Sequence, residues 1–223
     1  MKELKHLFFD LDGTLIDSGD GIITCLKHTF DKFDIDYSNF NFNQFIGPPL
    51  ESTIEDIISN DEKIISEAVS VFRKKYTEIG VLEENNLYDG ALKMIESLYN
   101  AGFELNLATS KPEVYAVKIV GNLGIAKYFK HVVGSLFDSR REKDKVLAHA
   151  LSISGADKSK SAMIGDRKYD LLAAEKYGVH GIGVLYGFGE LDELQKCKYI
   201  YLAKTPLDLL DYIKPTKIQK GEI

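Results

Sequence analysis

The chain has 223 residues, which is enough for one full core domain and a smaller second one. Hydrophobic residues make up 44% of the sequence and charged residues 28%, as is usual for a soluble globular protein. The net charge of −6 argues against a nucleic-acid binder, because such domains usually carry a basic face. We therefore expect no nucleic-acid partner, and any cation that meets an anionic ligand must be placed locally.

The N-terminal run and the cysteines predict a cytoplasmic protein. The apolar run before Asp10 is too short for a signal peptide, and no stretch approaches the ~20 apolar residues of a membrane helix. Cys25 and Cys197 lie far apart and outside any CxxC pattern, so they do not form a disulfide framework or a zinc site. We expect no membrane partner, and nothing in the sequence indicates an oligomeric state.

The first part of the chain predicts one strand followed by helices. The apolar run over residues 5–9 ends abruptly in residues 10–14 (DLDGT), which is typical of a buried strand and a polar loop. Apolar residues then recur at helical spacing, with a break by proline at residues 47–49. The predicted helices run from 18 to about 30, from about 50, and over 65–79. We predict that residues 18–87 are helical throughout, without a strand, and that the aromatic residues 30–45 form their core.

From residue 88 onward the sequence alternates between helices and strands. The predicted helices cover residues 92–99, 112–123, 143–151, 169–177 and 206–213. The predicted strands cover residues 103–108, 131–134, 161–164, 181–185 and 199–202. This alternation predicts an α/β fold with a doubly wound parallel sheet, a Rossmann-like core that also contains the first strand. We expect residues 1–17 and 88–223 to form this core, residues 18–87 to be an inserted helical domain, and the tail from Lys214 to be loose.

Polar side chains follow four of the predicted strands. They are Asp10 and Asp12 after the first strand, Thr109, Ser110 and Lys111 after the second, Lys143 after the third, and Asp166, Arg167 and Asp170 after the fourth. Ligands of an open parallel sheet bind at the carboxyl ends of the strands, so we expect these side chains in one crevice. Carboxylates, a hydroxyl and a lysine suit a phosphate together with Mg²⁺, which prefers oxygen ligands.

These residues, in this order, resemble the motifs of the haloacid dehalogenase superfamily. Residues 8–18 (FFDLDGTLIDS) resemble its first motif, Thr109 its second, Lys143 its third, and residues 165–170 (GDRKYD) its fourth. The helical insertion between the first two motifs is similar to the type-one cap of that family. The resemblance covers nearly the whole chain and implies a Mg²⁺-dependent phosphatase.

The resemblance also implies how the aspartates act. Asp10 would attack phosphorus and form an aspartyl-phosphate. Asp12 would protonate the leaving oxygen and then activate water, and its backbone carbonyl would bind the metal. The metal ligands would be Asp10, Asp12 and Asp166, with Asp170 as a further ligand or as a partner of one.

The same resemblance assigns the phosphate to Thr109, Ser110 and Lys143. Lys145 competes with Lys143, which we prefer because the buried face of the helix then lies behind it, formed by Val146, Leu147 and Ala150. Lys111 faces either the phosphate or the cap. Arg167 makes either a structural ion pair or a substrate contact.

Other functions fit the residues less well. A dehalogenase needs no acid beside its nucleophile, so Asp12 argues against that chemistry. A phosphomutase would use the same aspartates, but those of the superfamily tend to carry another residue in place of Thr14. A binding module without activity would be expected to lack Asp10 or Asp166, and both are present.

The expected substrate is a small phosphorylated metabolite. Residues 45–50 (FIGPPL) and 108–112 (ATSKP) resemble the phosphoglycolate phosphatase-like branch, in which related proteins are also assigned as 5′-nucleotidases. Residues 40–51 offer apolar side chains but no lysine or arginine, which favours a nucleotide-like pocket. We rank phosphoglycolate narrowly first, with a nucleoside 5′-monophosphate or another sugar or nucleotide monophosphate as the alternative.

Overall fold

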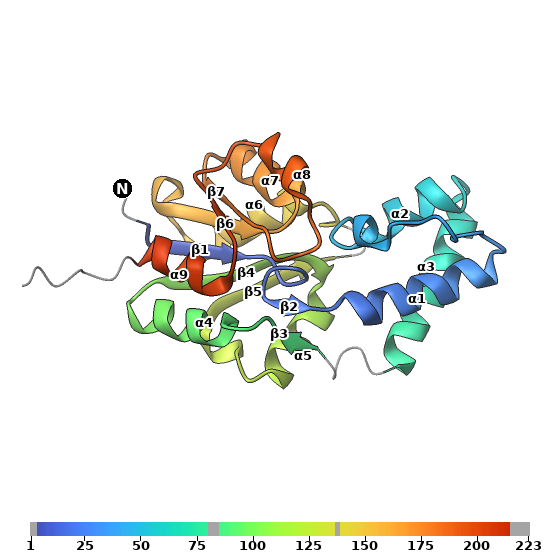
Figure 1. The fold of residues 1–223 in the computed structure, drawn as a ribbon, viewed down its shortest axis with the longest axis horizontal. Helices are drawn as coiled ribbons and strands as arrows, with labels where there is room; N and C mark the ends of the chain where they lie inside the picture. Colours follow the sequence, from blue (N-terminus) through green and yellow to red (C-terminus); the bar gives the residue numbers. More distant parts are fainter. Residues whose placement is uncertain (1–3, 80–84, 137–138, 215–223) are drawn as a thin grey trace, which may run out of the picture.

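A parallel six-stranded sheet forms the centre of the part of the chain that the computed structural model describes, residues 4–79, 85–136 and 139–214. The strand order is β5-β4-β1-β6-β7-β8, with parallel neighbours throughout (Figure 1). The strands are β1 (His6–Phe9), β4 (Glu104–Pro112), β5 (Phe129–Ser135), β6 (Ser161–Gly165), β7 (His180–Val184) and β8 (Tyr201–Ala203). The chain therefore builds outward from β1 in one direction and then from β6 in the other, which confirms the doubly wound core.

Helices cover both faces of this sheet. They are α4 (Ala91–Asn100), α5 (Glu113–Asn122), α6 (Lys143–Ser154), α7 (Lys168–Tyr177), α8 (Leu191–Gln195) and α9 (Pro206–Ile213), with short 3₁₀ turns at η2 (Ala126–Tyr128) and η3 (Lys158–Lys160). Side chains alternate along a strand, so Leu7 and Phe9 pack with α4, α5 and α9, whereas Phe8 packs with α6 and α7. All three are 0% exposed, because β1 is buried on both faces as expected for a central parallel strand. We call the sheet and these helices the sheet domain.

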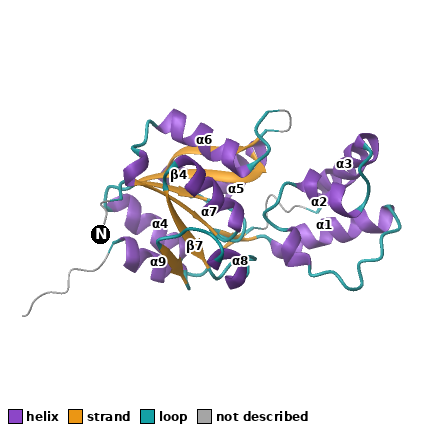
Figure 2. Ribbon diagram, turned by 90° about the horizontal axis from the view of Figure 1, so that it is seen from above, coloured by secondary structure: helices purple, strands orange, loops and turns teal. Residues whose placement is uncertain are grey.

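Three helices form a separate lobe beside the carboxyl ends of the strands. They are α1 (Gly19–Lys32), α2 (Leu50–Ile57) and α3 (Glu62–Glu78), and the 3₁₀ turn η1 (Phe42–Phe45) lies between the first two (Figure 2). We call these elements the helical lobe. The rings of Phe30, Phe40, Phe42 and Phe45 pack against one another at centroid distances of 5.6–6.4 Å. The aromatic residues thus form the core of the lobe, as the sequence predicted.

The prediction of helix without a strand over residues 18–87 is wrong at its end. Asn86–Leu87 forms strand β3, which pairs antiparallel with β2 (Ile16–Asp17). The two segments that connect the sheet domain with the helical lobe therefore lie side by side, and their backbone N–H and C=O groups form hydrogen bonds with each other there. A two-residue strand has no periodicity that a sequence pattern can reveal.

Short elements also escaped the prediction elsewhere. The five-residue helix α8 was not predicted, because it is shorter than two helical turns and shows no apolar period. The expectation of a loose tail falls, from residue 215 on, outside the described residues. Among the described residues, none of the helices has the length and apolar character needed to cross a membrane.

Candidate active site

Three aspartates lie together where β1 and β6 end. Asp10 follows β1, Asp166 follows β6, and Asp170 lies in the first turn of α7. One oxygen of each carboxylate lies within 4.8 Å of the others, and the residues are 4%, 0% and 0% exposed. Strands β1 and β6 are the neighbours between which the sheet reverses its direction of growth, the usual ligand position in such folds. We call these three side chains the carboxylate cluster.

Two glycines allow the backbone to pass close to the carboxylate cluster. Gly13 has a φ of +75°, and a Cβ atom there would lie 2.2 Å from an oxygen of Asp166. A Cβ atom at Gly165 would lie 2.1 Å from the carboxylate of Asp170. A side chain at either position would displace the carboxylates. The backbone at residues 13 and 165 can therefore approach them this closely only because both residues are glycine.

Lys143 bridges the carboxylate cluster. Its Nζ lies 2.8 Å from an oxygen of Asp10 and 2.8 Å from one of Asp170, and it donates to the carbonyl of Ala108 at 3.0 Å. Burial would lower the pKa of Lys143, but the charges of Asp10 and Asp170 outweigh it and raise the pKa. Lys145, the competing candidate, is exposed. The helical face behind Lys143 is buried as predicted.

One lysine cannot balance three buried carboxylates. The pKa of Asp166 is raised well above its usual value by burial and by the charges of Asp170 and Asp10. Burial also raises the pKa of Asp170 to about 6, with Lys143 opposing and Asp10 adding to the shift. A divalent cation at this place would remove the repulsion.

The carboxylate of Asp166 fits such a cation. Its Oδ2 accepts hydrogen bonds from the backbone N–H groups of Phe188 at 2.8 Å and Gly189 at 3.3 Å. Its Oδ1 is buried and has no hydrogen-bond partner among the described residues. A buried carboxylate oxygen without a partner is costly, and a metal ion is one way to satisfy it. The loop around residue 188 therefore lies against the carboxylate cluster.

Asp12 has a different environment from the carboxylate cluster. Both of its oxygens accept from Nζ of Lys111, at 2.8 and 2.9 Å, and the two residues are 8% and 7% exposed. Lys111 also lies over the ring of Tyr76, 5.1 Å from its centroid. Burial would lower the pKa of Lys111, but Asp12 and then Tyr76 outweigh it and raise the pKa. Lys111 lines the cleft between Asp12 and Tyr76 of the helical lobe, so the structure does not separate the two positions predicted for it.

The predicted phosphate residues lie beside these acids. Thr109 is 1% exposed, and its hydroxyl accepts from the backbone N–H of Lys111 at 3.2 Å. Thr109 and Ser110 line a cleft together with Asp10 and Asp12. Lys143 does not line this cleft but contacts the carboxylate of Asp10, which does. The structure thus brings together every predicted site residue, with the carboxylate of Asp12 apart from the carboxylate cluster.

The cleft lies between the sheet domain and the helical lobe. Its lobe side is mostly apolar and aromatic, and includes Phe45, Phe72 and Tyr76. Two arginines that the sequence analysis did not single out, Arg73 and Arg141, also line it. Both lie outside residues 40–51, where the sequence offered no cation, and no local pattern connects them to the aspartates.

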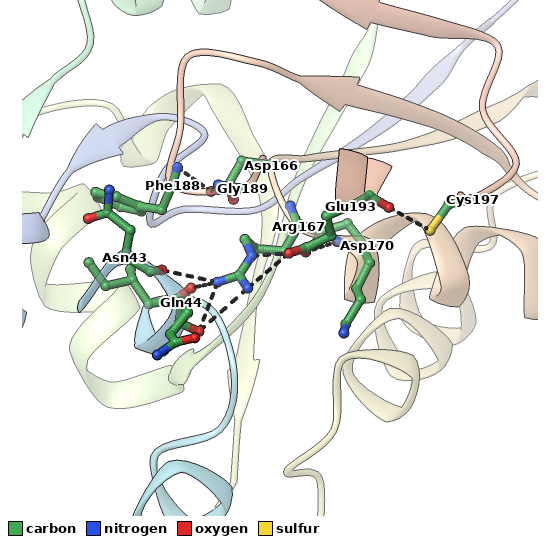
Figure 3. A network of polar contacts seen from close by, with 11 residues as sticks. Asn43, Gln44, Asp166, Arg167, Asp170, Phe188, Gly189, Glu193 and Cys197 are labelled. Atoms are coloured by element: carbon green, nitrogen blue, oxygen red, sulfur yellow. Dashed lines mark hydrogen bonds and ion pairs between the residues drawn. The ribbon is translucent and has the colours of Figure 1, made fainter. Parts of the chain in front are cut away.

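Arg167 makes an ion pair, one of its two predicted roles. Its guanidinium contacts the carboxylate of Glu193 on one side and backbone carbonyls of the helical lobe on the other (Figure 3). Glu193 lies 26 residues further along the chain, in the unpredicted helix α8, so the sequence could not identify it.

Comparisons with known proteins place most of the chain beside one family of hydrolases. A family model described as "Haloacid dehalogenase-like hydrolase" matches residues 7–184. A 5′-nucleotidase from Pseudomonas aeruginosa is 38% identical over 192 residues, which are 85% of this chain and 86% of that protein. A phosphoglycolate phosphatase from Aquifex aeolicus is 29% identical over 191 residues, 85% of this chain and 88% of that one. The crystal structure of "a predicted phosphatase from Clostridium acetobutylicum" matches with a TM-score of 0.89 and 35% identity, covering 95% of this chain and 98% of that one.

Proposed function

The chain belongs to the haloacid dehalogenase-like hydrolase family and is a phosphoric monoester hydrolase, and we propose that it works with Mg²⁺ through an aspartyl-phosphate on Asp10. The observation that carries this proposal is the carboxylate cluster, bridged by Lys143, beside a cleft that both Asp10 and Asp12 line. In this proposal the helical lobe, which the sequence analysis assigned to residues 18–87, is the cap that covers the cleft.

Asp10 and Asp12 differ in their surroundings, as their proposed roles differ. Asp10 is held in place by hydrogen bonds from the backbone N–H of Leu11 at 2.7 Å and from Lys143, so its carboxylate is oriented before substrate arrives. Asp12 lies outside the carboxylate cluster and lines the cleft, where its proposed role is to protonate the leaving oxygen and then to activate water. Thr109, Ser110 and Lys143 stabilise the phosphoryl oxygens.

Asp10, Asp166 and the backbone carbonyl of Asp12 would hold the Mg²⁺ ion, with Asp170 beside them. The ion would neutralise the phosphate and polarise its oxygens. The open Oδ1 of Asp166 and the excess of buried negative charge support this assignment.

Turnover of p-nitrophenyl phosphate tests the chemistry. We expect hydrolysis to require Mg²⁺, to disappear with excess chelator, and to fall by a factor of about 10³ or more in Asp10→Asn, because an amide is a poor nucleophile. Asp211→Asn is the matched control, since Asp211 is exposed on α9. Full activity of Asp10→Asn would show that another group attacks phosphorus.

For the substrate we propose a small phosphomonoester, with phosphoglycolate ranked narrowly first from the sequence. Cations at the wall of the cleft, among them Arg73, which also pairs with Glu51 at 2.7 Å, and Arg141, support a substrate with a second anion. A nucleoside 5′-monophosphate is the second candidate, favoured by the aromatic wall of Phe45, Phe72 and Tyr76.

The values of kcat/KM for the two candidates decide between them. A tenfold preference corresponds to about 1.4 kcal/mol of transition-state binding and is enough to choose. If p-nitrophenyl phosphate is hydrolysed as efficiently as both candidates, both substrate proposals are wrong and the phosphatase chemistry alone remains.

A further inference from the structure

The side chain of Arg167 joins the sheet domain to the helical lobe. It is 6% exposed, and Glu193 holds its guanidinium from the sheet side by two parallel contacts, Nε to Oε1 at 3.0 Å and Nη2 to Oε2 at 3.2 Å. The same carboxylate also accepts from the backbone N–H of Lys168 at 2.7 Å. Two-point pairing of this kind fixes the plane and the direction of a guanidinium (Figure 3).

The other edge of the guanidinium points at the end of η1. Its Nη1 donates to the carbonyl of Ile46 and lies 3.4 Å from the carbonyls of both Asn43 and Gln44. The last carbonyls of a helical turn have few partners within the turn and carry partial negative charge. A planar cation with several donors suits such a group of carbonyls, and a lysine could satisfy fewer of them.

The chain of the helical lobe passes directly over Arg167. Gly47 has a φ of +104°, and a Cβ atom there would lie 2.8 Å from Cγ of Arg167. Only glycine permits both this backbone angle and this approach. Phe45, Ile46 and Gly47 also line the cleft, so the position of Arg167 sets the position of that wall.

We propose that Arg167 is the latch that holds the helical lobe closed over the cleft. It is a positioning residue, because its guanidinium contacts the lobe and Glu193 and acts on the reaction through the cleft wall. Its own backbone N–H donates to the carboxylate of Asp170 at 3.1 Å, and Asp166 directly precedes it. Residues 166–170 therefore contain two members of the carboxylate cluster and also the side chain that contacts the helical lobe. This arrangement couples the position of the lobe to the geometry of the cluster.

Hydrogen exchange of the full chain tests the latch without substrate. In Arg167→Met we expect the amides of residues 42–51 to exchange at least about tenfold faster, while those of β1 and β6 keep the wild-type rate. Arg140→Met is the matched control. Arg140 is also a buried arginine, 8% exposed. It pairs with Glu113 and donates to the carbonyl of Gly134 at 2.9 Å, and both of these partners lie in the sheet domain. The Arg140→Met variant should leave the exchange rates of residues 42–51 unchanged.

Unchanged exchange over 42–51 in Arg167→Met, or an equal increase in Arg140→Met, would overturn the latch. If the Arg167→Met variant does not fold, hydrogen exchange of the Glu193→Gln and Gly47→Ala variants tests the proposal instead. The first loosens the guanidinium and the second moves the chain away from it, and both should speed exchange over 42–51. No change in either variant would equally overturn the proposal.

The consequence for turnover rests on the proposed function. With fewer closed molecules, KM for a substrate that contacts the lobe should rise about tenfold in Arg167→Met, while kcat changes less because bound substrate restores closure. Arg167→Lys should recover part of the loss. A raised KM with unchanged exchange would mean that Arg167 binds substrate directly, against the latch. If the wild-type protein hydrolyses no phosphomonoester but the exchange result holds, the proposed function fails and the latch stands.

Discussion

The pairing of Asp12 with Lys111 sets the charge of the cleft where a phosphate would enter. Both side chains are almost fully buried, and each oxygen of Asp12 contacts the ammonium group. Without Lys111 the carboxylate of Asp12 would stand unpaired and would repel an anionic substrate. The lysine thus makes an acid beside Asp10, the proposed nucleophile, compatible with phosphate binding, even though the whole chain is acidic.

Loss of Lys111 should therefore be costly in two ways. We expect Lys111→Met to lower the free energy of unfolding by about 3 kcal/mol, because it leaves a buried charge without its partner. We also expect kcat/KM for p-nitrophenyl phosphate to fall by about 10²-fold. The double variant Lys111→Met/Asp12→Asn should recover much of the stability in urea unfolding, since no unpaired charge remains, but none of the activity. Equal instability of the single and double variants would contradict this account.

At the scale of elements, helix α3 forms one of the contacts between the two parts of the molecule. Tyr76 of α3 stacks on Phe72 at 5.8 Å and on Tyr115 of α5 at 5.6 Å, and its ring covers Lys111. Phe72 and Tyr76 are 8% and 2% exposed. This aromatic stack connects the helical lobe to the sheet domain along the wall of the cleft.

Removing the ring of Tyr76 should affect both stability and substrate binding. We expect Tyr76→Ala to lower the free energy of unfolding by about 3 kcal/mol, because it leaves a cavity among buried rings. KM should also rise, since the cleft loses part of its wall. Tyr76→Phe keeps the ring and its contact with Lys111, so it should change both quantities far less. Thermal unfolding and steady-state kinetics of the two variants measure this, and similar losses in both would point to the hydroxyl instead of the ring.

At the scale of the whole molecule, the carboxylate cluster opposes folding when no metal ion is bound. The pKa of Asp166 in the fold lies above its usual value. Its ionised form therefore costs folding free energy at every pH above about 4, where the unfolded chain is already ionised. The protein accepts this penalty at the junction of β1 and β6 because a cation can remove it.

Mg²⁺ should accordingly raise the melting temperature at pH 7. We expect Asp166→Asn to be more stable than the wild type without metal, by about 1 kcal/mol or more, which is about 2–4 °C for a chain of this size. An asparagine oxygen can still accept from Phe188, so the loop should stay in place. This variant should show no further rise with Mg²⁺, whereas Asp211→Asn should respond like the wild type. A metal-free Asp166→Asn that melts below the wild type would contradict the proposed repulsion.

Much of the core and of the site was predictable from local patterns. The apolar run of residues 5–9 is a buried strand, and the buried face of α6 distinguished Lys143 from Lys145. The meeting of Asp10 with Asp166 followed from one rule, that parallel strands end at the same edge of the sheet. The periodicity of buried residues and the direction of a strand are properties of short segments. The sequence by itself therefore determined the first strand, the choice of Lys143 and the meeting of Asp10 with Asp166.

Tertiary structure alone decided the contacts between the two parts of the molecule. Lys111 of β4 lies over the ring of Tyr76 in the helical lobe, and Arg167 reaches the carbonyl of Ile46 across 121 residues. The pairing of Asn86–Leu87 with β2 likewise appears only once the chain has left the sheet domain and returned. These contacts depend on how the helical lobe sits against the sheet domain, and no periodicity within either part specifies that placement. A backbone carbonyl or a single charged residue has no sequence pattern that identifies its partner. The partner is therefore defined only when both parts are packed together.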